Sequence, residues 1–228
     1  MPASLTLGPR YKQDLSVVSS ALTRGITFKK SQTFSPPSTW KLSVNITVPG
    51  QTYTVDINTG TSPEIRIDWG DGVVEVFTTT GLKTHTYNWV RTHKVKISGK
   101  FKSNGNIRCG SSSTDRNRLV ETSAIPFIPG LINFQYTFSD CAGLTGPIPA
   151  DLFSYNPQIS SSGFYQTFYN CSGLTGSIPA DLFRYNTLVS SSGFYQTFYN
   201  CSGLTGSIPA DLFRYNTLVS SSGFYQTF

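Results

Sequence analysis

Charge and histidine are scarce in this chain of 228 residues, and no hydrophobic run is long. Only 13% of the residues are charged and only two are histidines, His85 and His93, so the side chains that most often carry acid–base catalysis or bind metals are few. No apolar stretch reaches the roughly 20 residues of a transmembrane helix, and the N-terminus lacks the apolar run of a secretory signal. We expect no enzyme activity, no metal or cofactor, no membrane insertion, and synthesis in the cytoplasm without ordinary secretion.

The few charges are unevenly placed. Residues 1–130 hold 16 Lys and Arg against 8 Asp and Glu, whereas residues 131–228 hold 2 against 4. The basic residues are scattered, with only Lys29 and Lys30 adjacent, and no nucleic-acid motif accompanies them. We therefore expect a solvated surface or contact with an acidic protein assembly, and no nucleic-acid binding.

What the chain has instead is a repeat of thirty residues. Residues 164–193 and 194–223 are identical, and residues 134–163 match them at 20 of 30 positions. A period of this length indicates stacked units, each of which buries its apolar face against the next, and such arrays mostly present a binding surface. The period favours a display or binding protein over an enzyme.

Positions that meet their own copy in the next unit are expected to form the core. They are Phe134/Phe164/Phe194/Phe224, Phe138/Phe168/Phe198/Phe228, Cys141/Cys171/Cys201, Leu144/Leu174/Leu204, Ile148/Ile178/Ile208, Leu152/Leu182/Leu212 and Phe153/Phe183/Phe213.

Within each unit, Pro179 favours an extended turn that enters a short helix, and an acidic residue such as Asp181 suits the start of that helix. Gly-Leu-Thr-Gly is the better candidate for a short strand, and the spacing of Phe194 and Phe198 fits a helix or a strand. The cysteines of the repeats fall thirty residues apart, and with no histidine in the repeats we expect buried, reduced thiols rather than zinc ligands.

The repeats carry a resemblance. Phe-x-x-Cys-x-Gly-Leu-Thr-Gly-x-Ile-Pro-x-x-Leu-Phe, present at 138–153, 168–183 and 198–213, resembles the leucine-rich-like repeats of bacterial surface proteins and of phage and prophage structural proteins. The match covers about 95 residues. It implies a right-handed solenoid used in adhesion, and it brings no catalytic residues.

A second resemblance lies upstream. Trp69-Gly70-Asp71-Gly72, followed by His85-Thr86-Tyr87 and an alternating strand at 95–99, resembles the polycystic-kidney-disease-type (PKD) immunoglobulin-like domain over roughly residues 38–102. The family implies a small β-sandwich that serves as a spacer or adhesion module, with Trp69 and Tyr87 in or near the core and a structural role for His85.

Together these features predict a mainly β chain with short helices: a PKD/Ig-like β-sandwich followed by a leucine-rich-repeat-like solenoid. The predicted parts are an N-terminal arm at 1–37, the sandwich at 38–102, a linker with a degenerate capping coil at 103–133, and the solenoid at 134–228. The arm has two interpretations, a disordered leader or a segment that orders on a neighbouring subunit.

An adhesion-type architecture without an export signal predicts a phage virion structural protein, such as a tail-fibre, head-fibre or decoration component. The alternative is a bacterial cell-surface adhesin or filament subunit. The expected partners are other virion or surface-assembly subunits through the N-terminal region, further copies of the chain, and a cell-surface glycan or protein. The ligand-binding candidates are exposed aromatic and amide side chains of the repeats, Tyr155/Tyr185/Tyr215, Tyr165/Tyr195/Tyr225 and Asn156/Asn186/Asn216.

The sequence stops at Phe228, just where the next Tyr-Asn-Cys would begin. An uncovered stack exposes apolar side chains and unpaired backbone, so another subunit or further repeats are expected to cover that end, and the identity of two copies favours further repeats.

Overall fold

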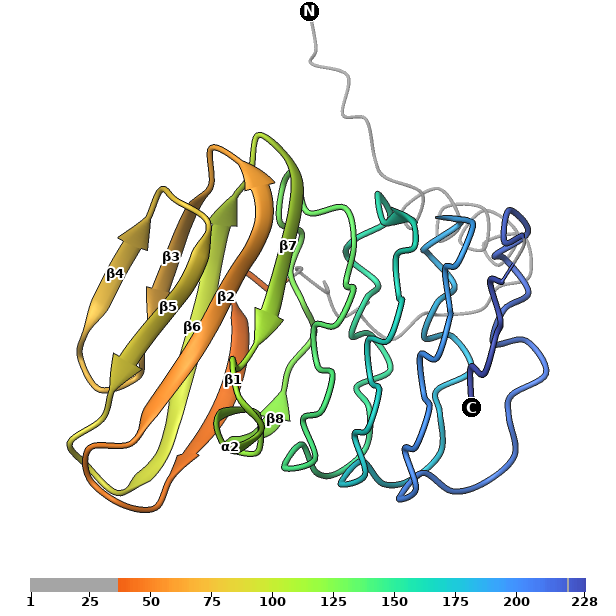
Figure 1. Cartoon of the computed structure of the whole chain (residues 1–228). Helices are drawn as coiled ribbons and strands as arrows, with labels where there is room; N and C mark the ends of the chain where they lie inside the picture. Colours follow the sequence, from red (N-terminus) through yellow and green to blue (C-terminus); the bar gives the residue numbers. More distant parts are fainter. Residues whose placement is uncertain (1–36, 221) are drawn as a thin grey trace, which may run out of the picture. The chain divides into compact units, whose positions relative to one another are not determined.

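The computed structural model describes residues 37–220 and 222–228. It divides the chain into two units, Met1–Ser35 and Pro36–Phe228, and the account below concerns the second. The predicted N-terminal arm therefore lies, except for its last residue, outside the described residues. The described part is mainly β-structure, as the sequence predicts, and it comprises a sheet region, residues 40–122, and a repeat region, residues 123–228 (Figure 1).

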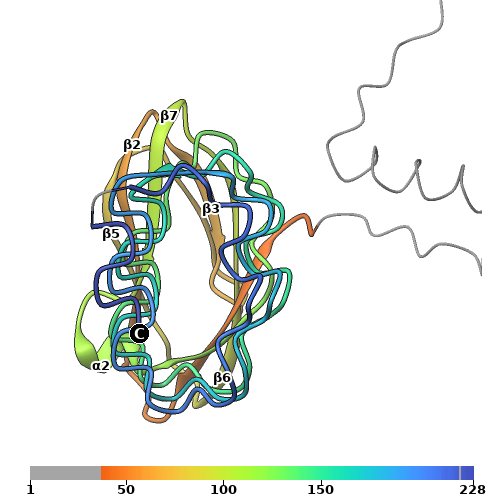
Figure 2. The same cartoon turned by 90° about the vertical axis from the view of Figure 1, so that its right-hand side faces the viewer.

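Two antiparallel sheets make up the sheet region, and Figure 2 shows them on opposite sides of the interior. The larger sheet has the order β4-β3-β6-β1-β8, from β4 (Val74–Phe77), β3 (Glu64–Asp68), β6 (Arg91–Lys100), β1 (Trp40–Ile46) and β8 (Leu119–Thr122). The smaller has the order β5-β2-β7, from β5 (Gly81–Thr86), β2 (Thr52–Thr61) and β7 (Ser103–Cys109).

Alternation along the strands decides which side chains enter the interior. Ile65 and Ile67 of β3 and Val95 and Ile97 of β6 are fully buried, and the residues between them are mostly exposed. This is the period of two expected for a strand with one face on the core. Gly99 is required where β6 passes β3, because a Cβ there would lie 2.1 Å from the carbonyl oxygen of Glu64.

The prediction of a linker is wrong for residues 103–122, because they complete both sheets. β7 pairs with β2 and β8 pairs with β1. The reason that β7 escapes recognition is its composition, Ser-Asn-Gly-Asn-Ile-Arg-Cys, in which glycine and asparagine take inward positions that normally hold aliphatic residues. Between the strands, Ser112 caps the short helix α2 (Ser113–Arg116) by accepting a 3.2 Å hydrogen bond from the N–H of Asp115.

The repeats contain turns rather than the predicted short helices. The N–H of Leu182 donates to Pro179 and that of Arg184 donates to Asp181, and these three-residue bonds do not continue into a helix. Asp181 pairs with Arg184 at 3.2 Å instead of capping a helix. The strands in the repeats are β9 (Ser160–Ser161) and β10 (Leu188–Val189), while Gly-Leu-Thr-Gly makes only isolated parallel bridges, such as Gly176 with Leu204.

Backbone hydrogen bonds join each turn of the chain to the next. The N–H groups of Phe164, Gln166 and Phe168 donate to the carbonyls of Gly193, Tyr195 and Thr197, and the same pattern recurs in the turns before and after. The intervening N–H groups donate three residues back, which is why Gln166 and Gln196 adopt a positive φ of 49°. Successive thirty-residue turns consequently lie side by side (Figure 1).

The predicted core positions are confirmed in every turn but the last. Phe164, Phe168 and Phe194 are at most 2% exposed, and their rings stack on their copies with centroids 5.4–5.8 Å apart. Burial falls only in the last turn, where Phe228 is 48% exposed. At the other end, the Trp40 ring meets Phe138 edge-on at 5.8 Å, so one hydrophobic core runs from the sheets into the repeats.

Candidate functional site

The repeat region presents one wall of half-exposed, uncharged side chains in parallel rows. Two of the rows follow directly after the buried Phe164, and the other two follow directly after the buried Phe168. The side chains of all four rows point away from the core. We call this surface the ladder face; it consists of Tyr165/Tyr195/Tyr225, Gln166/Gln196/Gln226, Tyr169/Tyr199 and Asn170/Asn200.

The tyrosines of the ladder face stack on one another along the axis of the repeats. The rings of Tyr165 and Tyr195 lie 4.8 Å apart and 4° from parallel, and Tyr195 and Tyr225 follow at 5.0 Å. Burial by these neighbours raises the pKa of Tyr165 and of Tyr195, so both hydroxyls are uncharged at neutral pH. Tyr195 therefore offers its edge and hydroxyl to a ligand, whereas both faces of its ring are occupied.

Amide side chains form two further rows. Gln166 Nε2 donates to Gln196 Oε1, and Gln196 Nε2 donates to Gln226 Oε1 at 2.7 Å. In the second row Asn200 Nδ2 donates to Asn170 Oδ1 at 3.0 Å, and Asn170 Nδ2 donates to a carboxylate oxygen of Asp140 at 2.8 Å. The other oxygen of that carboxylate accepts from Arg116 at 3.0 Å, which ties the row to the sheet region.

The predicted residues Tyr155, Tyr185 and Tyr215 belong to a different wall. The rings of Phe153 and Phe164 meet inside the turn at 4.8 Å, so the segments that carry them face each other across the interior; Figure 2 shows this closed outline along the axis of the stack. On this wall the guanidinium carbon of Arg184 lies 5.2 Å from the Tyr215 ring centre and 6.0 Å from that of Tyr185. The two predicted tyrosine sets therefore do not form one binding surface.

The prediction that Asn156, Asn186 and Asn216 face a ligand is wrong. They are 0%, 0% and 4% exposed. Asn186 Nδ2 donates to the carbonyl of Asn156 at 2.8 Å and Asn216 Nδ2 to that of Asn186 at 2.9 Å. Each amide thus satisfies backbone of the preceding turn, a role that a buried position demands of a polar side chain.

In the sheet region the Trp-Gly-Asp-Gly motif gathers an aromatic cluster around a hydrogen bond between His85 and Asp71. His85 Nε2 lies 2.7 Å from Asp71 Oδ2, and the His85 ring stacks on Trp69 and meets Tyr87 edge-on. Burial by itself would raise the pKa of Asp71, but the hydrogen bonds from His85 and from the N–H of Val73 outweigh it and lower that pKa. The Trp69 indole N–H donates to Glu75 at 2.7 Å. These contacts connect two loops with the strands β4 and β5, which is a structural arrangement.

All four cysteines are buried and free. Cys171 Sγ donates a 2.9 Å hydrogen bond to the carbonyl of Phe138, and Cys201 Sγ donates one of the same length to the carbonyl of Phe168. Each carbonyl belongs to the preceding turn. Burial raises the pKa of every thiol, that of Cys109 and Cys201 to about 12. The thiols act as small core residues, as the sequence predicts.

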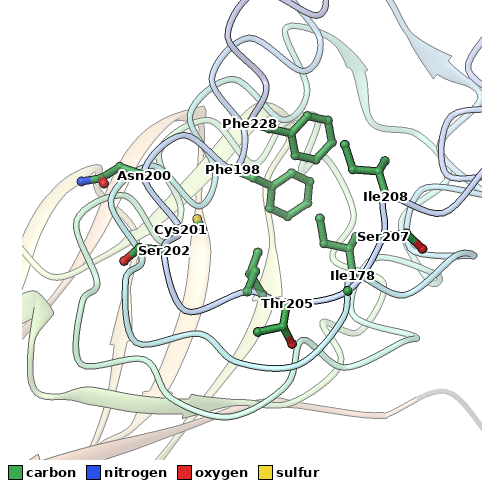
Figure 3. Close-up of a pocket in the computed structure, with 11 residues that line it drawn as sticks. Ile178, Phe198, Asn200, Cys201, Ser202, Thr205, Ser207, Ile208 and Phe228 are labelled. Carbon is green, nitrogen blue, oxygen red and sulfur yellow. The ribbon is translucent and has the colours of Figure 1, made fainter.

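A hollow of about 350 Å³ opens on the last turn, lined by apolar side chains that include Phe198 and Phe228 and by polar ones that include Asn200 and Thr205 (Figure 3). The equivalent positions in earlier turns are covered by the following turn: Ile178 is 7% exposed, whereas Ile208 at the hollow is 54% exposed. The hollow is therefore part of the stacking surface of the repeats.

Within residues 37–220 and 222–228 no three or more His, Cys, Asp or Glu side chains gather as a metal site would require. Over the same residues, no helix has the length and apolar character to cross a membrane. The comparisons with family models, curated proteins and solved structures return no match.

Sequence reasoning found one row of the ladder face, Tyr165/Tyr195/Tyr225, and missed the other three. A signal for them was present. Gln166, Tyr169 and Asn170 recur thirty residues later as Gln196, Tyr199 and Asn200, and they flank the inward Thr167 and Phe168. This recurrence marks them as candidates for an outward row, although Thr167, which recurs in the same way, is fully buried.

Proposed function

We propose that this chain is a non-enzymatic phage virion structural protein, a tail-fibre, head-fibre or decoration component. In this proposal the sheet region is a PKD/Ig-like β-sandwich, the repeat region is a leucine-rich-repeat-like solenoid, and the solenoid is displayed for adhesion or host recognition. The N-terminal residues dock the chain onto the particle.

The observation that carries the proposal is the uninterrupted core between the two regions. Trp40 of β1 packs on Phe138 of the first repeat. β7 also makes the same kinds of hydrogen bonds to the first repeat that one repeat makes to the next. For example, Thr137 Oγ1 donates to Ile107 of β7 at 2.9 Å, as Thr167 Oγ1 donates to Phe134. Such a joint holds the repeats in a fixed orientation on the sheets, which suits a displayed surface.

The titratable groups of the described residues support a structural rather than a chemical role. Asp71 is bound to His85, Asp68 to Lys96, and Asp140 to Arg116. Asp115 is 3% exposed and accepts hydrogen bonds from the N–H groups of Thr54 and Ser111. These carboxylates hold loops and turns together, and none of them lines the hollow at the last turn.

Peptide mass spectrometry and antibody labelling of purified particles test the proposal. We expect the protein at a fixed copy number per particle, and we expect a variant without residues 1–37 to fold but to be absent from particles. Finding the protein only on cell surfaces would replace the proposal with the adhesin alternative, and normal occupancy by the shortened chain would exclude N-terminal docking.

A further inference from the structure

The ladder face differs from an aromatic platform of the kind that stacks on sugars. Both faces of Tyr195 are covered, by Tyr165 at 4.8 Å and by Tyr225 at 5.0 Å. Tyr169 and Tyr199 stack likewise at 5.3 Å and 9°. Along the inside of the tyrosine rows, as at Tyr195, a ligand therefore reaches ring edges and hydroxyl groups, so hydrogen bonding rather than ring stacking must hold it there.

The amide rows supply matching hydrogen-bonding groups. A side-chain amide carries two N–H donors and an oxygen with two lone pairs. Gln196 uses one N–H on Gln226 and one lone pair on Gln166. Asn170 uses one N–H on Asp140 and one lone pair on Asn200. Each amide inside a row therefore keeps one donor and one acceptor for a ligand.

The face carries no net charge over the two identical repeats, because its rows consist of Tyr, Gln, Tyr and Asn. The neighbouring carboxylate, Asp140, is already bound by Arg116. A charged ligand would find no counter-ion on this wall, and stripping its water would cost free energy without compensation. The chemistry thus selects an uncharged ligand that is rich in hydroxyl groups.

The spacing of the rows sets the form of the ligand. The same group recurs once per turn, every 4.8–5.3 Å for the stacked tyrosines. An extended peptide laid along the rows repeats its side chains every two residues, or roughly 6.6 Å, and would fall out of register within two turns. Successive sugar rings of an extended, unbranched polysaccharide repeat close to the spacing of the turns.

We infer that the ladder face binds an uncharged, unbranched polysaccharide laid along the axis of the repeats, with one sugar unit per turn. The Gln166 and Asn170 rows donate to and accept from its hydroxyls, and the tyrosine hydroxyls of the adjacent rows add further hydrogen-bonding groups. This inference rests on the proposed function, since it names the ligand class of the displayed surface.

Calorimetric titration and saturation-transfer NMR of the whole chain test the inference. The probes are cellohexaose, chitohexaose and maltohexaose, their monosaccharides, and polygalacturonate as a charged polymer. We expect at least one uncharged hexasaccharide to bind and its monosaccharide to bind at least tenfold more weakly, because a single sugar unit contacts one turn and a longer chain contacts the next turn as well. Failure of all three hexasaccharides, or binding of polygalacturonate alone, would overturn the inference.

Variants then locate the contact. Tyr195→Phe with Tyr199→Phe keeps the ring stacks and removes two hydroxyls, and Gln196→Met keeps the volume and removes the amide. Combined, they should weaken binding at least tenfold with unchanged melting, while Tyr185→Phe on the opposite wall should bind as the native chain does. Equal affinity of the combined variant and the native chain would refute this site. If the combined variant melts lower, the two-tyrosine variant alone decides.

Particle occupancy separates the two proposals. A chain that occupies particles normally yet binds no uncharged hexasaccharide would leave the virion function standing and remove the ligand assignment. A chain that binds a hexasaccharide but never occurs in particles would do the reverse.

Discussion

The sheet region and the repeat region solve the same problem, that of pairing polar groups, in opposite ways. Unlike residues meet in the sheets: Lys96 pairs with Asp68 at 2.9 Å and Lys94 with Glu121 at 2.9 Å. Like residues meet in the repeats, where Asn contacts Asn, Gln contacts Gln and Tyr stacks on Tyr. An uncharged side chain can be placed against its own copy, whereas a charged one would repel it. This explains the low charge of the repeats.

The first repeat, residues 134–163, pairs with unlike residues of the sheet region on one side and with like residues of the second repeat on the other. It differs from the later repeats at ten positions, and several of these touch the sheet region. Tyr136 takes the place of the ladder glutamine and lies under the guanidinium of Arg108 at 4.7 Å. Asp140 replaces an asparagine and binds Arg116. Gln158 replaces a leucine and donates at 2.9 Å to the carbonyl of Leu131, in the segment that joins the sheet region to the first repeat. Its substitutions adapt one end of the stack to an unlike neighbour.

The substitution with the largest expected effect removes an aromatic ring, that of Phe164, whose ring neighbours all belong to the repeat region. Phe164 is fully buried, and its ring contacts those of Phe134, Phe153, Phe183 and Phe194. Phe164→Ala should lower the free energy of unfolding by about 3–5 kcal/mol. All three tryptophans lie in the sheet region, so their fluorescence in a urea titration reports whether the loss reaches the sheets.

A shared core predicts that far-UV circular dichroism and tryptophan fluorescence shift together in this variant. Phe224 occupies the same position of the repeat as Phe164 but is 47% exposed, so Phe224→Ala is the matched control. It should lower the free energy of unfolding clearly less than Phe164→Ala does. An unshifted fluorescence transition beside a shifted dichroism transition would show two independently folding regions.

The second test compares two asparagines of the same repeats. Asn186 is buried and donates to the carbonyls of Asn156 and Phe153, whereas Asn200 is exposed and donates to Asn170. Asn186→Ala should lower the free energy of unfolding by about 2 kcal/mol, since it removes a buried donor and leaves a small cavity. Asn200→Ala should cost less than about 0.5 kcal/mol. Similar losses from both, measured by urea unfolding, would contradict the structural role assigned to Asn186.

These asparagines also show where sequence reasoning reaches its limit. The thirty-residue period identified the buried phenylalanines, leucines and cysteines, because recurrence of an apolar residue has one physical meaning. Recurrence of an asparagine has two, a ligand-binding row or a buried bond to the preceding turn, and the period does not choose between them. In the structure Asn156 lies three residues after Phe153, and a tight turn brings both to the interior.

The sheets show a different limit. Alternating Ile65, Ile67 and Trp69 indicated a strand and a turn from sequence, and the structure has both. β7 could not be found in that way, because its buried positions include Gly105 and Asn106, which favour turns elsewhere. Asn106 is tolerated there since its Nδ2 donates to Asn133 at 2.8 Å, a contact between residues far apart in sequence.

A third test uses acid to separate the regions. Hydrogen bonding to Lys96 lowers the pKa of Asp68, and hydrogen bonding to Ser43 and Lys94 lowers that of Glu121. A carboxylate whose pKa is lower in the folded chain stabilises it fully above the unfolded value of about 4, and this stabilisation is lost as the pH falls through the folded value. Urea unfolding should show a loss of about 1 kcal/mol between pH 6 and pH 3, small because Glu121 is 64% exposed.

Asp68→Asn with Glu121→Gln provides the control for the acid effect. The double variant should lose less stability between pH 6 and pH 3 than the native chain, because it lacks the two carboxylates that take up protons. An identical pH dependence in the native chain and the double variant would place the acid sensitivity elsewhere.

The smallest effect is expected where charge does enter the repeats. Arg184 pairs with Asp181 at 3.2 Å and lies 5.2 Å from the centre of the Tyr215 ring, and the first repeat has Ser154 at this position. Both contacts lie at the surface, so each contributes a few tenths of a kcal/mol. Arg184→Ser should therefore change the free energy of unfolding by no more than about 0.5 kcal/mol, and less still in 1 M salt, where surface attraction is screened. A loss above 2 kcal/mol would mean that the stack depends on charge after all, and that the contrast with the sheet region is false.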